Sequence, residues 1–125
     1  MEKSGLLKNL KSNGFAIDEG LHYCGNSETI YSEVLLSACE EGKEKIPLLA
    51  KCIELKDIKR YQIEVHGIKN VAMTIGATQL CKSAASQNDL AKAGDWEGIC
   101  NNQEKLLQIY EQTIKSIQQS LSTSD

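Results

Sequence analysis

The chain has 125 residues, a usual length for one domain, and 41% of them are apolar, which is enough to build a single packed core. Its 17 acidic and 14 basic residues give a net charge of -3, which argues against a nucleic-acid-binding protein. No apolar run approaches the roughly 20 residues that cross a bilayer, and the first residues lack the pattern of a signal peptide. We therefore expect a cytoplasmic protein whose five cysteines stay reduced, with neither nucleic acid nor a membrane among its partners.

The apolar pattern of the first half is helical, and a single proline with 5% aromatic residues disfavours an all-β fold. Short helices are expected over residues 3–11 and 15–21. A longer helix over about 27–41 should end at Gly42, and a separate helix over about 44–55 should hold Pro47 in its first turn. The residues expected on the inner sides of these two helices are Ile30, Val34, Leu35, Ala38, Leu48, Leu49, Cys52, Ile53 and Leu55.

The second half is more regular. Asp57 is a suitable N-cap for a helix that ends at Gly76. Two further helices are expected over 77–93 and about 96–120, followed by a frayed tail from Leu121 to Asp125. The inward residues of the 57–75 helix recur in steps of three and four, and they are Ile58, Tyr61, Val65, Ile68, Ala72 and Ile75.

Four long helices with short connections favour an all-α fold, an up-down four-helix bundle. One or two short accessory helices at the N-terminus would cover one end of it. Because no linker, repeat or low-complexity stretch interrupts the sequence, we expect one domain over residues 1–125, with a core of about 10–118.

The outward face of the 57–75 helix has an unusual composition. At 100° per residue, His66 lies about 130° and Asn70 about 170° from the buried seam, so both should face water, with Lys69 on the flank. Ile63 also points outward, and Gly67 follows His66 although glycine costs a helix roughly 1 kcal/mol relative to alanine. These residues predict a flat, partly apolar platform around one histidine.

This platform suits phosphoryl chemistry. An imidazole in water is partly neutral near pH 7, and its free nitrogen can attack a phosphoryl group. A lysine ammonium one turn further along, as at Lys69, can neutralise and hydrogen-bond the phosphoryl oxygens. A surface histidine beside a surface lysine also occurs on helices with no such function, so the pair alone is a weak signal.

A longer set of residues is more specific. It comprises Val65-His66-Gly67-Ile68-Lys69-Asn70, Ile75-Gly76-Ala77, Leu80, and Ala93-Gly94-Asp95, with Gly14 to Leu21, Cys24-Gly25-Asn26 and Tyr31 upstream. Over roughly residues 10–118 the chain resembles the histidine-containing phosphotransfer (HPt) family, whose hallmark is H-x-x-K-G in a long helix. The resemblance implies a four-helix bundle with accessory helices. It also implies that His66 is the phospho-acceptor and that Lys69 assists the phosphoryl group.

The resemblance further implies a role and partners. Members of the family carry phosphoryl groups between receiver-domain aspartates, as phosphohistidine carriers rather than turnover catalysts. The expected partners are a response-regulator receiver domain and a hybrid sensor kinase. The chain itself is expected to bind no cofactor, since the Mg²⁺ lies on the receiver, and to be a monomer.

The chain departs from the family pattern at three positions. Asn70 replaces the glycine that follows the lysine, and its amide is a candidate hydrogen-bond donor to a phosphoryl oxygen. Gln87 and Asn88 stand where the family often has Leu and Glu. The docking surface for a partner is expected around His66, at Gln62, Ile63, Gly67 and Met73.

The sequence is also compatible with other functions. A helical adaptor that docks a receiver or kinase without carrying a phosphoryl group is the main alternative, followed by a purely structural or thiol-based protein. His22 and Cys24 with the remaining cysteines could ligate a metal ion, but no C-x-x-C spacing occurs and most of the cysteines fall among apolar positions. No glycine-rich phosphate loop follows a strand, which disfavours ATP binding.

Overall fold

The computed structural model describes residues 4–123, and within this range every regular element is an α-helix. Four helices are long and two are short. The helices are α1 (Gly5–Ser12), α2 (Ile17–Tyr23), α3 (Glu28–Leu55), α4 (Ile58–Ile75), α5 (Thr78–Lys92) and α6 (Trp96–Thr123). None of these helices combines the length and the apolarity that crossing a bilayer requires.

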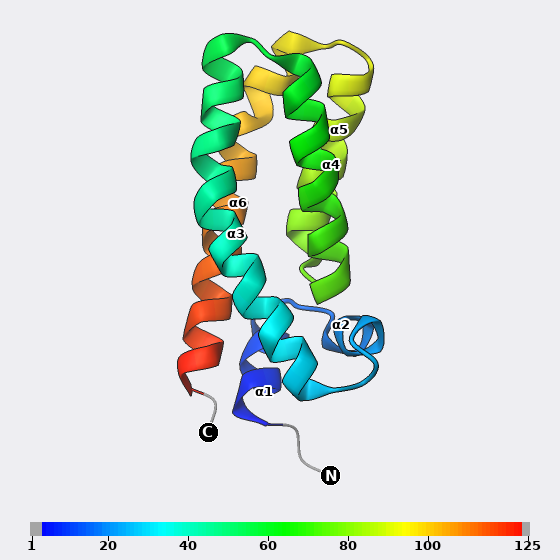
Figure 1. Ribbon diagram of the computed structural model, residues 1–125, viewed down its shortest axis with the longest axis vertical. Coiled ribbons are helices and arrows are strands. Elements are labelled where there is room, and N and C mark those ends of the chain that lie inside the picture. The colour runs from blue at the N-terminus through cyan, green and yellow to red at the C-terminus, as the bar shows by residue number, and fades with distance from the viewer. Residues whose placement is uncertain (1–3, 124–125) are drawn as a thin grey trace.

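The long helices α3, α4, α5 and α6 run alternately up and down and form a bundle (Figure 1). Each packs against its neighbour in the chain, and α3 also packs against α6, which closes the ring. The short helices α1 and α2 cover the end of the bundle at which α3 begins and α4 ends (Figure 1). The predicted all-α, up-down four-helix bundle with accessory N-terminal helices is confirmed.

The predicted break at Gly42 is wrong, because α3 continues from Glu28 to Leu55 through both Gly42 and Pro47. Gly42 is buried, and a Cβ atom added to it would lie only 2.4 Å from Cδ1 of Ile114 on α6. The glycine therefore lets α3 and α6 approach closely instead of ending a helix. The role of Gly42 could be predicted only by knowing which helix faces it.

Two residues expected in the core are exposed. Ile30 is 47% exposed and Leu55 is 64% exposed, whereas Leu35, Ala38, Leu49 and Cys52 of the same predicted set are buried. Tyr31 takes the inward position beside Ile30, and its hydroxyl donates a hydrogen bond to the carbonyl oxygen of Ile75 at 2.7 Å. Leu55 is the last residue of α3 and directly precedes Lys56, whose backbone is left-handed.

The C-terminal helix is longer than expected. The sequence predicts a frayed tail from Leu121, but α6 continues through Thr123, and Leu121 packs against the core. The last two residues of the predicted tail lie outside the described range.

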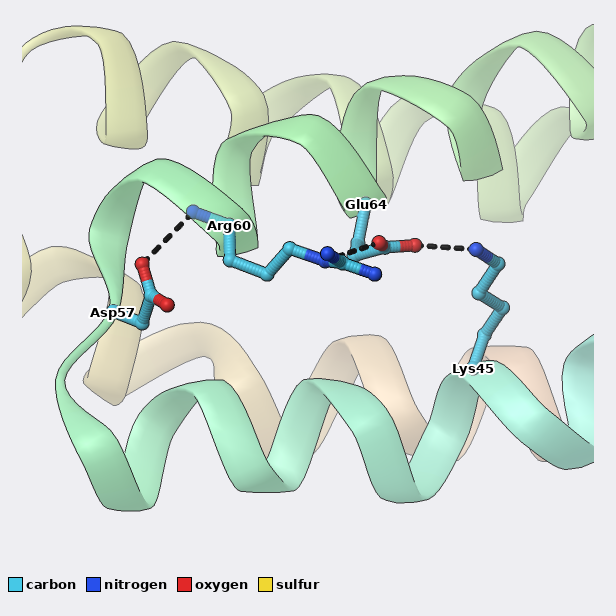
Figure 2. Close-up of polar contacts among 4 residues, drawn as sticks. All are labelled: Lys45, Asp57, Arg60 and Glu64. Atoms are coloured by element: carbon cyan, nitrogen blue, oxygen red, sulfur yellow. Dashed lines mark hydrogen bonds and ion pairs between the residues drawn. The ribbon is translucent and has the colours of Figure 1, made fainter.

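Helix α4 is fixed at both of its ends. At its start the carboxylate of Asp57 accepts a hydrogen bond from the backbone N–H of Arg60 at 3.0 Å (Figure 2). At its end Gly76 adopts φ +76°, and its carbonyl accepts a hydrogen bond from the backbone N–H of Ala16 at 2.9 Å. The predicted seam faces the core, with only Ile58 partly exposed. Helix α4 therefore has a defined rotation about its axis.

A buried carboxylate links α4 to α3. Glu64 is 5% exposed and lies between Lys45 of α3, with which it forms an ion pair, and Arg60 of α4, whose Nε donates to it at 2.7 Å (Figure 2). Burial raises the pKa of Glu64, but the hydrogen bonds and charges of Lys45 and Arg60 outweigh burial and hold that pKa below its usual value. The carboxylate is therefore ionised at neutral pH and holds α3 and α4 together.

Candidate functional site

The outward face of α4 carries the histidine singled out from the sequence. His66, Gly67 and Asn70 are exposed, and Ile63 and Met73 are 59% and 44% exposed. Because α4 packs against α2, α3 and α5 through its other sides, this face is left to solvent. The expected exposure of His66 and Asn70 is confirmed.

The residues around His66 form a compact set. At 100° per residue, Met73 lies two turns from His66 on nearly the same line of the helix surface. Gln62 and Lys69 flank His66 on one side and are partly buried, while Ile63 and Asn70 flank it on the other side and are exposed. We call this set, Gln62, Ile63, His66, Gly67, Lys69, Asn70 and Met73, the His66 face.

Neither His66 nor Lys69 is engaged by the rest of the described chain. The side chains of both residues lack a hydrogen bond or an ion pair with any residue in 4–123. Lys69 follows His66 by one helical turn, so its flexible side chain can carry the ammonium toward the imidazole or toward a group bound there. The arrangement offers a free nucleophilic nitrogen with a mobile cation beside it.

Gly67 is not required by the fold. It lies inside α4 with no positive φ, and a Cβ atom added to it would meet no other atom within 4 Å. Glycine at such a position costs a helix about 1 kcal/mol relative to alanine. What glycine does provide is a low surface directly beside His66, which leaves the space next to the imidazole open.

The structure contains a buried polar network that the sequence analysis missed. Gln87 is 1% exposed, and its Nε2 donates to the hydroxyl of Tyr61 and to the carbonyl of Ile99, both at 2.9 Å. The Tyr61 hydroxyl in turn donates to Oε1 of Gln103 at 2.5 Å. Burial raises the pKa of Tyr61 to about 12, so the phenol keeps its proton and remains a donor. The network joins α4, α5 and α6 in the core.

A sequence signal for this network did exist. Gln87 continues the three- and four-residue spacing of the inward residues Leu80, Ala84 and Ala91 along α5, and it is buried as they are. A polar residue on a buried stripe predicts a hydrogen-bond partner, although the spacing alone does not name that partner.

The thiols and the second histidine do not form a comparable cluster. Within residues 4–123 no group of three or more His, Cys, Asp or Glu side chains is arranged to hold a metal ion. All five cysteines are free, with Cys24, Cys39 and Cys52 buried and Cys100 exposed. His22 is exposed on α2, where its ring lies edge-on to Tyr23 at 6.2 Å between centroids.

Comparison with known proteins bears on the fold. No family model matches the sequence, and a search of curated proteins found no match. Among solved structures the chain is similar to the maize histidine-containing phosphotransfer protein ZmHP2, with a TM-score of 0.76 and 17% identity over 94% of this chain and 90% of that one. It is also similar to a rice protein described as a putative histidine-containing phosphotransfer protein, with a TM-score of 0.60 and 17% identity over 93% and 91% of the two chains. The chain therefore has the fold of histidine-containing phosphotransfer proteins.

Proposed function

We propose that this protein is a phosphorelay intermediate that accepts a phosphoryl group on His66 and passes it to a response regulator. The single observation that carries the proposal is the exposed imidazole of His66, with Lys69 one turn away, on a face of α4 that no other helix covers. The shared fold with histidine-containing phosphotransfer proteins supports it independently.

The transfer step needs few groups from this chain. The unprotonated ring nitrogen of His66 attacks the phosphorus of a receiver aspartyl phosphate, an N–P bond forms, and the P–O bond to the aspartate breaks. The aspartate leaves as a carboxylate, and the same steps in reverse load the next receiver. The ammonium of Lys69 neutralises charge on the phosphoryl oxygens, and the amide of Asn70 donates a hydrogen bond to one of them. This chain supplies no metal ligand to the step, and the Mg²⁺ would be held by the receiver domain.

The partners follow from this chemistry. The donor is the receiver domain of a hybrid sensor kinase or the kinase itself, and the acceptor is a response-regulator receiver domain. Both dock on the His66 face, where Ile63 and Met73 provide apolar contact and Gln62 provides a polar one. The protein acts in the cytoplasm as a monomer.

A direct test uses a receiver domain that carries a labelled aspartyl phosphate. Wild-type protein should take up the label in a form that is labile to acid and stable to alkali, and His66→Gln should take up none. His22→Gln is the matched control, because His22 is also exposed but lies on α2. Full uptake by His66→Gln would contradict the proposal. Binding of the receiver without any uptake, unaffected by His66→Ala, would identify the protein as a non-transferring adaptor.

A further inference from the structure

The fully exposed charged residues of α4 are cationic, and they lie outside the His66 face. Lys59 and Arg60 are exposed, whereas Glu64, the only carboxylate in the sequence of α4, is buried. Residues 56–76 contain four cations and two carboxylates, although the chain as a whole has 17 acidic and 14 basic residues. The helix that carries His66 is therefore a basic region of an acidic protein.

Lys59 continues the line of His66 along the helix. The two residues are seven apart, so at 100° per residue they differ by about 20° in direction and lie about 10 Å apart along the axis. Ile63 lies between them on the same exposed face. The side chain of Lys59 makes no hydrogen bond or ion pair with any residue in 4–123. A protein that covers His66 and Ile63 therefore also comes within reach of the ammonium of Lys59.

Arg60 is held by the buried carboxylate of Glu64. Its Nε donates to Oε2 of Glu64 at 2.7 Å, and its two terminal nitrogens make no hydrogen bond to another residue in 4–123 (Figure 2). Lys45 already pairs with Glu64, so the three side chains together carry an excess of positive charge. That excess lies at the surface, because the side chain of Arg60 is 55% exposed and that of Lys45 only 25%. An arginine that is already oriented loses less entropy when it binds a further group.

We propose that Lys59 and Arg60 form a docking site for carboxylates on the surface of the receiver domain, and that they favour receivers with acidic residues there. The inference rests on the proposed function, because that function brings a receiver to His66. The ammonium of Lys59 attracts the acidic surface, and the terminal nitrogens of Arg60 donate paired hydrogen bonds to one carboxylate. Both residues lie about two turns from His66, so they act on association with the receiver and not on the transfer step.

The test measures binding and transfer with the full chain and the receiver domain of the uptake assay, at about 50 mM and about 500 mM NaCl. At the lower salt Lys59→Gln and Arg60→Gln should each raise the dissociation constant about three- to tenfold, because a cation is removed from the interface. At the higher salt the effect of Lys59→Gln should largely disappear through screening. The transfer rate at saturating receiver should stay at the wild-type value. Arg60→Lys should recover only part of the lost affinity, because lysine does not provide paired donors.

Lys43→Gln is the matched control, because Lys43 is an exposed lysine of α3 outside this surface, and it should bind as the wild type does. Lys59→Gln should keep the thermal midpoint of the wild type, so it decides the inference even if Arg60→Gln destabilises the fold. Equal dissociation constants for the wild type, Lys59→Gln and Arg60→Gln at low salt, or an equal loss with Lys43→Gln, would overturn the docking site. A wild type that binds the receiver but takes up no label would contradict the proposed function, and the binding comparison would still decide the inference.

Discussion

The imidazole of His66 is reachable because neighbouring side chains leave it free. It makes no side-chain hydrogen bond within the described chain, and Gly67 presents no side chain beside it. A histidine held by a carboxylate or packed into the core would have its nitrogens occupied or screened. Lys69 is only partly exposed, but its ammonium forms no ion pair with an acidic residue in 4–123.

Replacing Lys69 with alanine should slow transfer from a phosphorylated receiver by about 10- to 1000-fold, because charge on the phosphoryl oxygens loses its stabilisation. Lys69→Arg should recover much of the rate, since it restores a cation on a long side chain. Rapid-quench measurement of single-turnover transfer gives the comparison. Equal rates for Lys69→Ala and the wild type would remove Lys69 from the mechanism.

Substitutions at Gly67 distinguish an effect on the docking of a partner from an effect on the stability of the fold. Gly67→Ala should raise the unfolding free energy by about 1 kcal/mol, because the site is helical and a Cβ atom meets nothing there. Gly67→Trp should leave the thermal midpoint nearly unchanged yet block transfer, because the indole covers the approach to His66. Thermal unfolding and the transfer assay provide the two readouts. Unhindered transfer by Gly67→Trp would show that the partner approaches from another direction.

The sequence was sufficient to predict the exposure of His66 and Asn70 and insufficient to name the hydrogen-bond partners of Gln87. Helical spacing alone puts His66 and Asn70 on the outward face, because the apolar seam fixes the rotation of the helix. The hydrogen bonds of Gln87 to Tyr61 and Ile99 join three helices. Such partners depend on how the helices are placed in space, which local periodicity does not encode.

At the scale of elements, the position of α4 depends on how its C-terminal end meets the segment before α2. Gly76 needs a left-handed backbone there, and a Cβ atom on it would lie 2.3 Å from the carbonyl oxygen of Ala16. The hydroxyl of Tyr31 donates a hydrogen bond to the carbonyl of Ile75, the residue before Gly76. The segment before α2 therefore does more than cover apolar surface, because together with Tyr31 of α3 it holds the end of the helix that carries His66.

Gly76→Ala should lower the unfolding free energy by at least about 2 kcal/mol, from backbone strain together with the contact to Ala16. Gly94→Ala is the matched control, since Gly94 also has a positive φ but its added Cβ atom meets nothing within 4 Å. It should cost only about 1 to 2 kcal/mol from strain. Urea unfolding measures both, and equal losses would show that the contact with Ala16 has no effect.

The helical character and order of the elements could be predicted, but their number could not, because the sequence predicts two helices where the structure has the single helix α3. The seams, Asp57 and Gly76 locate α4 closely, because caps and periodicity are local features. The helix end predicted at Gly42 was wrong, because glycine is as suited to a close helix crossing as to a helix end. Only the proximity of Ile114 on α6, distant in sequence, distinguishes the two roles.

For the whole molecule, stability should depend on pH through Glu64. Burial opposes its ionisation, but Lys45 and Arg60 lower its native pKa below the unfolded value of about 4.3. Its contribution to stability is therefore complete above that value and is lost as the pH falls through the native pKa. Glu64→Gln should lower the unfolding free energy by about 1 to 3 kcal/mol at pH 7.

That difference should shrink as the pH is lowered below about 4. Urea unfolding of both proteins from pH 7 to pH 3 measures it. Glu54→Gln is the control, because Glu54 is exposed and its contact with Lys51 is long, at 3.9 Å. A difference between Glu64→Gln and the wild type that stays constant over this range would rule out an ionised Glu64 as its source.

In the proposed function the whole bundle presents the imidazole of His66 to a partner, so the decisive measurement is the location of the phosphoryl group itself. After incubation with a phosphorylated receiver domain, ³¹P NMR combined with mass spectrometry of peptides prepared at alkaline pH identifies the modified atom. The account predicts a phosphorus–nitrogen bond on the ring of His66 and an unmodified His22. A phosphoryl group on His22 or on a carboxylate, with His66 unmodified, would contradict it.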